Sequence, residues 1–542
     1  MRFISRLLIA CACVQVVAGA AHAREETPGS AAVADAPSQK SDEPKGQHFN
    51  IWEYQVSGNT LLENSSIEKT VYPFLGPDKS IEDVENARVE LETLYKDAGY
   101  PTVIIDIPEQ DVSNGVVALE VVEGRIDRLR VSGSRYFSLG RIRKSVPALA
   151  EGEVPYLPDV QEQLQALNTE SADRSVTPVF RAGRTPGTVE VDLRVKDELP
   201  LHGGIEVNGR NSADTTRSRL VADIRYDNLW QRAHSVALTY QTSPEDTDEV
   251  EVIAGTYVMP VGGAGDRLAF YAISSESDSD VASAGALAVI GEGTIIGTRW
   301  IKPLAPLPGY FHNFTFGADY KDFDEGTELV GADTLETPIN YTKFSTQYSG
   351  TLLNESAQTS FSAGIDFAPR GLGNKEKEFE EKRFEATPNF AFLTGSFSHE
   401  YRFDNGIRLK GATQGQLAGE PLISNEQFSV GGAESVRGYH ESEILGDDGL
   451  QASLEVHTPA WVLPWELGNL HALAFADGAY IKLHDTLPGT DDSDEIYGAG
   501  FGLRLDGGRV FKAALDLAWP FRDTESVDAG DTRLHFLVRT GF

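Results

Sequence analysis

Residues Thr532 to Phe542 read TRLHFLVRTGF, and this last stretch of the chain decides the fold. Its residues alternate in character: Leu534, Phe536, Val538, Thr540 and Phe542 share one face of an extended strand, and Arg533, His535, Arg539 and Gly541 share the other, with Leu537 as the exception. An apolar face toward lipid and a polar face toward a lumen are typical of a strand in a membrane-spanning β-barrel. A soluble β-sandwich would also alternate, so the connections between strands must decide.

The connections from residue 201 to residue 542 alternate in length. This region predicts 16 strands, and some are joined by tight turns such as Asp404-Asn405-Gly406 and Asp506-Gly507-Gly508, which suit hairpins. Long polar connections lie at residues 322–338, 370–383, 484–495 and 522–531. Short turns at one end and long loops at the other favour an outer-membrane barrel with the long loops outside the cell. We interpret the acidic run at residues 491–495 as a solvated loop rather than a cation site.

The N-terminus predicts export. Residues 1–23 combine Arg2 and Arg6 with an apolar run and small residues ending at Ala23, which is the layout of a cleaved signal peptide. A lipoprotein signal ending at Cys11 is the alternative, but only about four apolar residues would precede the cysteine, against the roughly 7–15 of a normal apolar region. Residues 24–48, rich in Ala, Pro, Ser and charge, predict a flexible linker. Both cysteines lie in the predicted signal, so the mature chain would have no disulfide.

Composition excludes several classes of function. The chain has 47 Lys and Arg against 82 Asp and Glu, a net charge of −35, which argues against nucleic acid as a partner. No apolar run after the signal reaches the roughly 18 residues of a membrane helix, so a membrane crossing requires a closed barrel. The 11 histidines are scattered and no nucleotide-binding, zinc-protease or hydrolase motif is present. We therefore predict no enzyme, no cofactor and no metal site, and interpret His440 as an ordinary loop residue.

Residues 49–200 contain a repeat. Val56-Ser57-Gly58 recurs as Val131-Ser132-Gly133, and 133 − 58 gives a period of 75 residues. Each copy predicts the order strand, helix, helix, strand, strand, which indicates two small α/β domains in tandem. In the first copy, Ser80 and Asp83 predict a capping box at the start of a helix that ends at Gly99, with an apolar face comprising Ile81, Val84, Ala87, Leu91, Leu94, Tyr95 and Ala98. One unrelated α+β domain with an accidental match is the alternative.

The segment Ser429–Glu441, SVGGAESVRGYHE, places a single arginine among glycines. It falls between predicted strands 11 and 12, in the sixth long connection. Glycines let the backbone fold tightly, and an arginine inside a lumen needs a carboxylate partner. Asp477, in the predicted strand 13 (LAFADGAY), is the candidate partner of Arg437; it faces inward if Leu473, Phe475 and Tyr480 pack elsewhere. Exchanging the two charges would then restore some function.

Two motifs carry a resemblance to a known family. Val436–Tyr439 resembles the VRGY/F motif in the sixth loop of polypeptide-transporting outer-membrane barrels, and Phe475–Gly478 resembles their aromatic-x-Asp-x-Gly element, although Ala479 stands where the final glycine would be. The repeats resemble POTRA domains, and Val121–Ser138 resembles a junction between two of them. From about Phe49 to its end the chain is similar to the two-partner secretion transporters, the TpsB family of ShlB/FhaC/HecB-type haemolysin secretion/activation proteins.

The resemblance implies a fold and a site. The fold is two periplasmic α/β POTRA domains, residues 49–124 and 125–200, followed by a 16-stranded antiparallel transmembrane β-barrel, residues 201–542. The implied site is a lumenal loop anchor made of Arg437, Gly438, Tyr439 and Asp477. The terminal Phe542 resembles the membrane-assembly signal of bacterial outer-membrane proteins, which implies the barrel-assembly machinery as a partner during biogenesis.

The resemblance also implies a function in the bacterial outer membrane. The chain would export a large partner polypeptide, haemolysin-like or adhesin-like, without ATP, after its POTRA domains bind the unfolded partner in the periplasm. Relatives often carry an N-terminal plug helix, for which residues 24–48 show no convincing sequence. The alternatives are an outer-membrane protein assembly factor, a passive porin or receptor, and an outer-membrane hydrolase.

Overall fold

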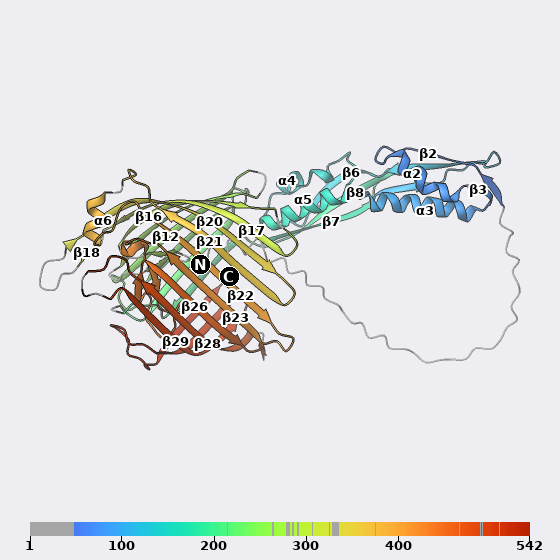
Figure 1. The fold of residues 1–542 in the computed structure, drawn as a ribbon. Helices are drawn as coiled ribbons and strands as arrows, with labels where there is room; N and C mark the ends of the chain where they lie inside the picture. Colours follow the sequence, from blue (N-terminus) through green and yellow to red (C-terminus); the bar gives the residue numbers. More distant parts are fainter. Residues whose placement is uncertain are drawn as a thin grey trace, which may run out of the picture. The chain divides into compact units, whose positions relative to one another are not determined.

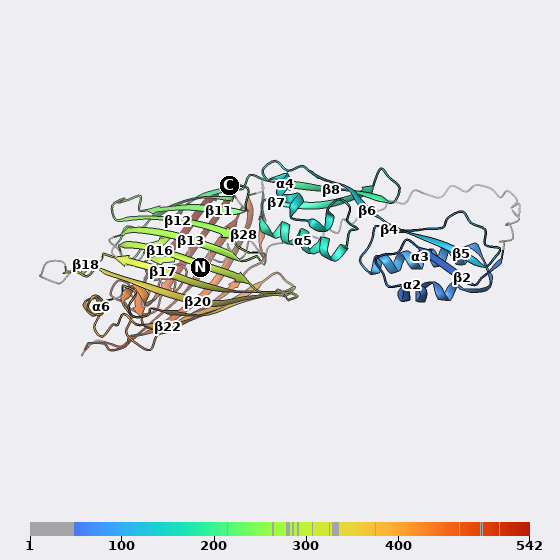
Figure 2. The same cartoon turned by 90° about the horizontal axis from the view of Figure 1, so that it is seen from above.

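The computed structural model describes residues 48–542 apart from residues 214, 263–264, 278–281, 285–286, 290–291, 306, 325, 328–334, 374, 465–466, 488, 490 and 509. The predicted signal peptide and nearly all of the predicted linker lie outside the described residues. The described chain divides between Leu199 and Pro200 into two compact units. Figures 1 and 2 show the elements of both units in two views.

The N-terminal unit begins with a three-stranded sheet covered by helices. Its elements are β1 (Phe49–Ile51), β2 (Glu53–Ser57), α2 (Asn64–Val71), η1 (Tyr72–Phe74), β3 (Gly76–Lys79), α3 (Ile81–Asp97), β4 (Val103–Asp106) and β5 (Val116–Glu123). The sheet order is β2-β5-β4, with β2 parallel and β4 antiparallel to β5. β1 and β3 form a separate small pair. Leu91 and Tyr95 of α3 pack with Leu119 of β5 in the core between helices and sheet.

The helix start at Ser80 is confirmed. The Asp83 amide donates to the Ser80 hydroxyl at 3.4 Å, and the Ser80 amide donates to the Asp83 carboxylate at 2.8 Å, so both halves of the capping box are present. The buried stripe of α3 is Val84, Ala87, Leu91 and Tyr95. The prediction that Ile81 belongs to this stripe is wrong: it is 79% exposed, because the first helical residue lies beyond the stripe that covers the sheet.

A second sheet of the same layout follows. Its elements are β6 (Arg125–Ser132), α4 (Leu139–Lys144), η2 (Pro147–Leu149), α5 (Leu157–Glu170), β7 (Arg174–Ala182) and β8 (Thr188–Asp197). The order is β6-β8-β7, again with the first strand parallel to the centre and the hairpin partner antiparallel. Gly58 and Gly133 have positive φ angles of 83° and 89°, and a Cβ on either would lie 2.3 or 2.4 Å from the carbonyl oxygen of Val121 or Val195. The two glycines turn the chain away from equivalent points of the two sheets.

The C-terminal unit is a closed antiparallel barrel. Its strands are β9 (Leu201–Asn208), β10 (Arg219–Leu229), β11 (His234–Thr242), β12 (Val250–Pro260), β13 (Arg267–Ser277), β16 (Gly293–Pro303), β17 (Tyr310–Phe323), β20 (Ile339–Leu353), β21 (Ala357–Phe367), β22 (Ala391–Arg402), β23 (Arg408–Leu417), β26 (Asp448–His457), β27 (Trp461–Leu463), β28 (Gly468–Lys482), β29 (Ser493–Asp506), β30 (Phe511–Pro520) and β31 (Arg533–Gly541). β26 and β27 follow each other along the same side of one neighbour, β28, and therefore count as one strand of the barrel. The 17 described segments thus form the predicted 16 strands.

The terminal strand closes the barrel and alternates as predicted. β31 pairs with β9 from Leu537 opposite Asn208 to Gly541 opposite Gly204. Leu534, Val538 and Phe542 are exposed on the outer surface, whereas His535 is buried inside. Among the described residues, none of the helices combines the length and apolar character that a membrane crossing requires.

The long connections gather at one end of the barrel because alternate antiparallel strands turn there. The fifth (residues 368–390) contains α6 (Glu376–Lys382). The sixth (residues 418–447) contains η3 (Ser424–Glu426), β24 (Phe428–Val430) and β25 (Ile444–Gly446). It lies between the eleventh and twelfth strands of the barrel, as predicted. The described parts of the third and fourth add β14 (Ala282–Ala284), β15 (Leu287–Val289), β18 (Gly326–Thr327) and β19 (Leu335–Glu336).

Candidate functional site

Strand β28 presents Asp477 to the lumen. Along this strand Leu473, Phe475, Asp477, Ala479 and Ile481 are buried, while the residues between them are more exposed. The expectation that Leu473 and Phe475 pack elsewhere is wrong, because they share the parity of Asp477 and therefore its face; Tyr480 does point outward. An apolar inner face is stable here because the sixth connection packs against it: Ala479 and Ile481 share a buried cluster with Val436 and Tyr439.

Arg437 lies against Asp477 in fork geometry. Its Nε donates to Oδ2 at 2.7 Å and its Nη2 to Oδ1 at 2.8 Å, while its backbone amide also donates to Oδ2 at 3.2 Å. Nη1 lies 2.9 Å from Glu455, and the guanidinium sits 3.5 Å above the centre of the Phe475 ring. Both charged side chains are almost fully buried, at 5% exposure for Arg437 and 0% for Asp477. The structure thus brings the two predicted partners together, and Phe475 holds the planar cation from below.

Further carboxylates converge on the same arginine. Ser453 donates to Asp477 at 2.7 Å, and Asp516 lies 4.0 Å from Arg437 while receiving Arg504 at 2.6 Å. Sequence reasoning missed Ser453, Glu455 and Asp516. The period-two alternation of β26 and β30 could have placed them inside, but not opposite Arg437. Arg437 shares these carboxylates with two further cations: Arg504, 2.6 Å from Asp516, and Lys410, 3.7 Å from Glu455.

Glycine is required where the loop meets the wall. Gly438 has a φ of 109°, and a Cβ there would approach the Pro520 nitrogen at 3.0 Å. On the wall side, a Cβ on Gly498 would lie 2.0 Å from the carbonyl oxygen of Arg437. The Gly438 amide donates to Nε2 of His535 on the terminal strand at 3.0 Å. The backbone at residues 437–438 therefore lies directly on the wall, at a distance that side chains would prevent.

Tyr439 completes the fastening and is fully buried. Its hydroxyl lies 3.1 Å from the carbonyl oxygen of Tyr497 and 3.0 Å from that of Arg522, and it accepts the Arg522 amide at 3.1 Å. The predicted set Arg437, Gly438, Tyr439 and Asp477 thus forms one contact region, which reaches β28, β29, β31 and the last long connection.

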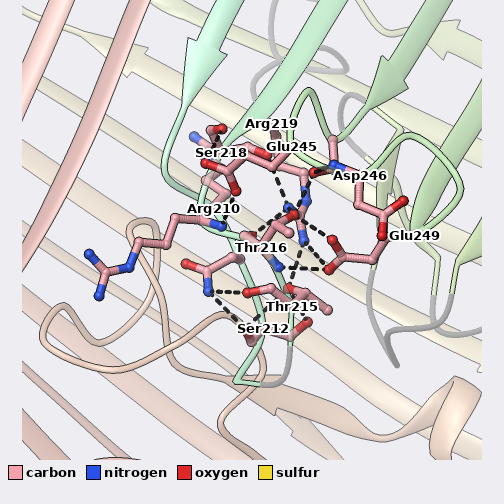
Figure 3. A network of polar contacts seen from close by, with 12 residues as sticks. Arg210, Ser212, Thr215, Thr216, Ser218, Arg219, Glu245, Asp246 and Glu249 are labelled. Carbon is pink, nitrogen blue, oxygen red and sulfur yellow. Dashed lines mark hydrogen bonds and ion pairs between the residues drawn. The ribbon is translucent and has the colours of Figure 1, made fainter.

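The first long connection joins the same assembly through a polar network (Figure 3). The Glu249 carboxylate accepts the Thr216 amide at 2.8 Å and lies 3.8 Å from Arg219, which tie the first connection to the second. In Figure 3 the Arg210 side chain points away from this group; it donates to Glu434 of the sixth connection at 2.5 Å. The backbone carbonyl oxygen of Asn211 accepts a hydrogen bond from the Glu441 amide at 3.0 Å.

Phe542 lies at the other end of the terminal strand. Its side chain is 67% exposed on the outer surface, and its amide donates to the Gly203 carbonyl oxygen at 3.0 Å. A Cβ on Gly203 would come within 2.9 Å of the Phe542 ring. The residue is remote from the loop site, so its role as an assembly signal stays a separate prediction.

Two family models match the chain. Residues 187–505, more than half of it, match "Haemolysin secretion/activation protein ShlB/FhaC/HecB", and residues 49–124 match "POTRA domain, ShlB-type". The chain is 23% identical over 511 residues to the outer membrane transporter CdiB of Dickeya dadantii, covering 90% of this chain and 86% of that one. It is 19% identical over 490 residues to the heme/hemopexin transporter protein HuxB of Haemophilus influenzae, covering 88% and 84%.

Solved structures share the fold. CdiB from Escherichia coli superposes with a TM-score of 0.61 at 20% identity, covering 94% of this chain and 93% of that one. BamA from Haemophilus ducreyi lacking POTRA domains 1–3 superposes with a TM-score of 0.56 at 14% identity, covering 91% and 100%. At these identities the likeness concerns architecture alone, and both structures support the same barrel.

Proposed function

The chain belongs to the family of ShlB/FhaC/HecB haemolysin secretion/activation proteins, and from this membership we propose that it carries one large partner polypeptide across the outer membrane to the cell surface. It is an outer-membrane transporter whose barrel crosses the membrane and whose POTRA domain lies in the periplasm. The partner is a haemolysin-like or adhesin-like exoprotein made as a separate chain.

The observation that carries the proposal is the sixth connection bound inside the barrel. Arg437 is buried against Asp477 with three donated hydrogen bonds, and glycines at 438 and 498 allow the contact. A passive porin would need no loop arginine bound to its inner wall, and no pair of glycines that lets the loop backbone contact the wall closely. In this proposal the sixth connection is a fixed element beside the path of the unfolded chain, and we assign its anchoring to Arg437, Gly438, Tyr439 and Asp477.

We further propose that residues 125–200 form a second POTRA domain after the first at residues 49–124. The support is the shared strand order, β2-β5-β4 and β6-β8-β7, and the equivalent glycines 75 residues apart (133 − 58). Each sheet has two edge strands whose outer backbone groups have no strand partner within the sheet. An unfolded partner adds to such an edge as a further strand, which gives a grip that tolerates many sequences.

Export proceeds without ATP in this proposal. Folding of the partner outside the cell draws the chain forward, and no nucleotide motif accompanies the barrel. The lipid of the outer membrane contacts the apolar outer face. The barrel-assembly machinery recognises the terminal strand with Phe542 during biogenesis. The proposal assigns no catalytic reaction to the chain.

The main alternative to an exporter is an outer-membrane protein assembly factor, because the chain shares its architecture with BamA. One experiment distinguishes the two. Phe49–Pro200 is deleted in the native host, and the proteins in the medium and the outer membrane are compared with the intact strain by mass spectrometry. Loss of one large secreted polypeptide, with other outer-membrane proteins unchanged, is the expected result and identifies the partner. A general fall in outer-membrane proteins would instead assign the chain to barrel assembly.

A further inference from the structure

The outer end of the lumen contains an apolar core, which a barrel lumen ordinarily lacks. Wall residues of six strands face inward there and are buried: Val250, Val252, Ile273, Ile295, Phe323, Ile339, Tyr341 and Phe392. They are covered by Ala368, Phe379, Ala386 and Phe390 of the fifth connection and by Leu422 and Ile423 of the sixth. We call residues 368–373 and 375–390 together with residues 418–427 the cap. α6, within the cap, lies at the end of the barrel that carries the long connections (Figures 1 and 2).

A buried charge cluster holds the cap to the wall. Glu426 receives Lys321 of β17 at 2.5 Å, Lys343 of β20 at 2.8 Å and the Tyr341 hydroxyl at 2.6 Å. The side chain of Glu426 is 2% exposed and those of both lysines are 12% exposed. Lys343 also lies 3.2 Å from Asp366. The cluster is satisfied only while Glu426 is docked, because Lys321 would otherwise lose its closest carboxylate.

A second ion pair fastens the fifth connection to its neighbours. Arg383, which directly follows α6, forms a fork with Asp447, with Nη2 donating to Oδ2 at 2.7 Å. Asp447 is fully buried and also accepts the Leu422 amide at 2.9 Å and the His484 amide at 2.7 Å. This one carboxylate therefore joins the fifth, sixth and seventh connections.

The helix of the cap depends on its contact with the wall. α6 has seven residues, too few for a stable helix in isolation, and Phe379 is the buried residue among them. The other side chains of this segment are mostly charged, so the segment stays soluble once released. Buried ion pairs suit such a release, because both partners regain water when they separate. A surface fixed permanently would be better served by apolar packing throughout.

We propose that the cap is an outward gate: it closes the outer end of the lumen at rest, with Arg383–Asp447 as its latch, and it leaves the wall when the partner polypeptide passes. The gate rests on the proposed export function: the cap gives the exporter a closed state between rounds of export. The apolar wall that the cap uncovers then contacts the apolar side chains of the exiting chain. The latch and the cluster at Glu426 are separate from the Arg437 anchor, which stays docked on β28.

The first test measures leak. Arg383→Gln removes the charge from the latch, and we expect it to raise single-channel conductance in lipid bilayers and the uptake of large antibiotics by cells. Arg370→Gln is the matched control, since Arg370 is an exposed arginine of the same connection. Equal conductance for Arg383→Gln and wild type would overturn the gate.

The second test locks the cap. Nη2 of Arg383 donates to the His484 carbonyl oxygen at 3.2 Å, so Arg383→Cys with His484→Cys places one thiol on each side of the latch for a bifunctional reagent to bridge. Before cross-linking we expect export with raised leak. A bifunctional thiol-reactive reagent (a bis-maleimide with a disulfide in its spacer) should abolish both, and reduction of the spacer should restore both. Thr351→Cys with Ser360→Cys, whose hydroxyls lie 3.2 Å apart on the neighbouring strands β20 and β21, is the control that should export when cross-linked.

The outcomes separate the gate from the export function beneath it. Undiminished export by the cross-linked Arg383→Cys/His484→Cys protein would overturn the gate while leaving export intact. Failure of Arg383→Gln to export would also overturn it, because the latch would then be needed for export itself. If deletion of residues 49–200 removes no secreted polypeptide, the export function fails, and only the leak measurement bears on the gate.

Discussion

Replacing Arg437 by alanine should undock the tip of the sixth connection without unfolding the barrel. The change removes two side-chain hydrogen bonds to Asp477, the contact with Glu455 and the stacking on Phe475. Removing one partner of a buried ion pair costs about 3–5 kcal/mol. We expect the lower end, because Asp477 keeps the Ser453 hydroxyl at 2.7 Å and Glu455 keeps Lys410 at 3.7 Å. A loss of about 3 kcal/mol makes the undocked loop roughly 100-fold more populated.

Hydrogen exchange measures this population directly. In purified protein in detergent, the amides of residues 436–439 should exchange roughly 100-fold faster in Arg437→Ala than in wild type, while wall amides stay protected. Arg437→Lys should fall between the two, because it keeps the charge and loses the fork. Export in cells should stop with Arg437→Ala.

The control is a second arginine fork of the same chemistry. Arg299 binds Asp319, with Nη2 donating to Oδ2 at 2.7 Å, but both residues belong to the wall strands β16 and β17. Arg299→Ala should leave exchange at residues 436–439 unchanged. If Arg437→Ala exchanges there no faster than Arg299→Ala, or exports normally, the anchor has been assigned wrongly.

The remaining predictions concern packing, charge and local stability. Gly498→Ala should expose the sixth connection as Arg437→Ala does, since its Cβ would lie 2.0 Å from the Arg437 carbonyl oxygen; Gly255→Ala on β12, with no atom within 4 Å of its Cβ, should be silent in the same exchange measurement. Ser80→Ala should cost about 1 kcal/mol of stability in α3, seen as faster exchange of its first-turn amides. Burial alone would raise the pKa of the Asp197 carboxyl. The hydrogen bonds that it accepts from Tyr136, Ser134, Arg135 and Phe137 lower this pKa by more, so the net pKa lies below its ordinary value. Its stabilisation should be complete above the unfolded value of about 3.9 and be lost as pH falls through the folded pKa; exchange at residues 134–137, corrected for intrinsic rates, should show this in wild type and not in Asp197→Asn.

The structure changes one expectation about charge reversal. Sequence alone suggests that Arg437→Asp with Asp477→Arg restores some function, because the pair would be kept with its signs exchanged. Arg437 also lies 2.9 Å from Glu455 and 4.0 Å from Asp516, however, so an aspartate there would face two carboxylates. We now expect the exchanged pair to stay inactive in export, and recovery of secretion would show that Asp477 is the sole partner that matters.

The barrel was predictable because its rules are local. Alternation along residues 533–542 fixes which side chains face lipid, and the lengths of the connections fix which end carries the loops. The capping box at Ser80 and the hairpins of both α/β sheets were predictable for the same reason. α4 ends at Lys144 because Pro147, three residues later, cannot continue the helix and begins η2 instead.

The partners of the loop residues were predictable only in part. Asp477 could be proposed for Arg437 because an acid in an apolar strand is conspicuous. Glu455, on a strand of mixed polarity, gives no such signal, and neither does Glu426, which meets Lys321 from 105 residues earlier. The apolar inner wall also misleads local reasoning: Phe475 and Tyr341 face a lumen, where polar residues are expected, because loops from distant parts of the chain fold in to cover them.

The tip and the base of the sixth connection are held by different contacts, and this difference bears on which of them moves. Arg437 at the tip combines its fork to Asp477 with backbone contact on the wall, a stacked ring below it and a buried tyrosine two residues later, so undocking it would break all four together. Glu426 at the base holds two lysines whose charges regain hydration on release, so separation returns much of what burial cost. Release of the base and the fifth connection also uncovers their apolar contacts with the wall, and the apolar side chains of the passing chain replace those contacts. The tip remains as the fixed point about which the outer end opens.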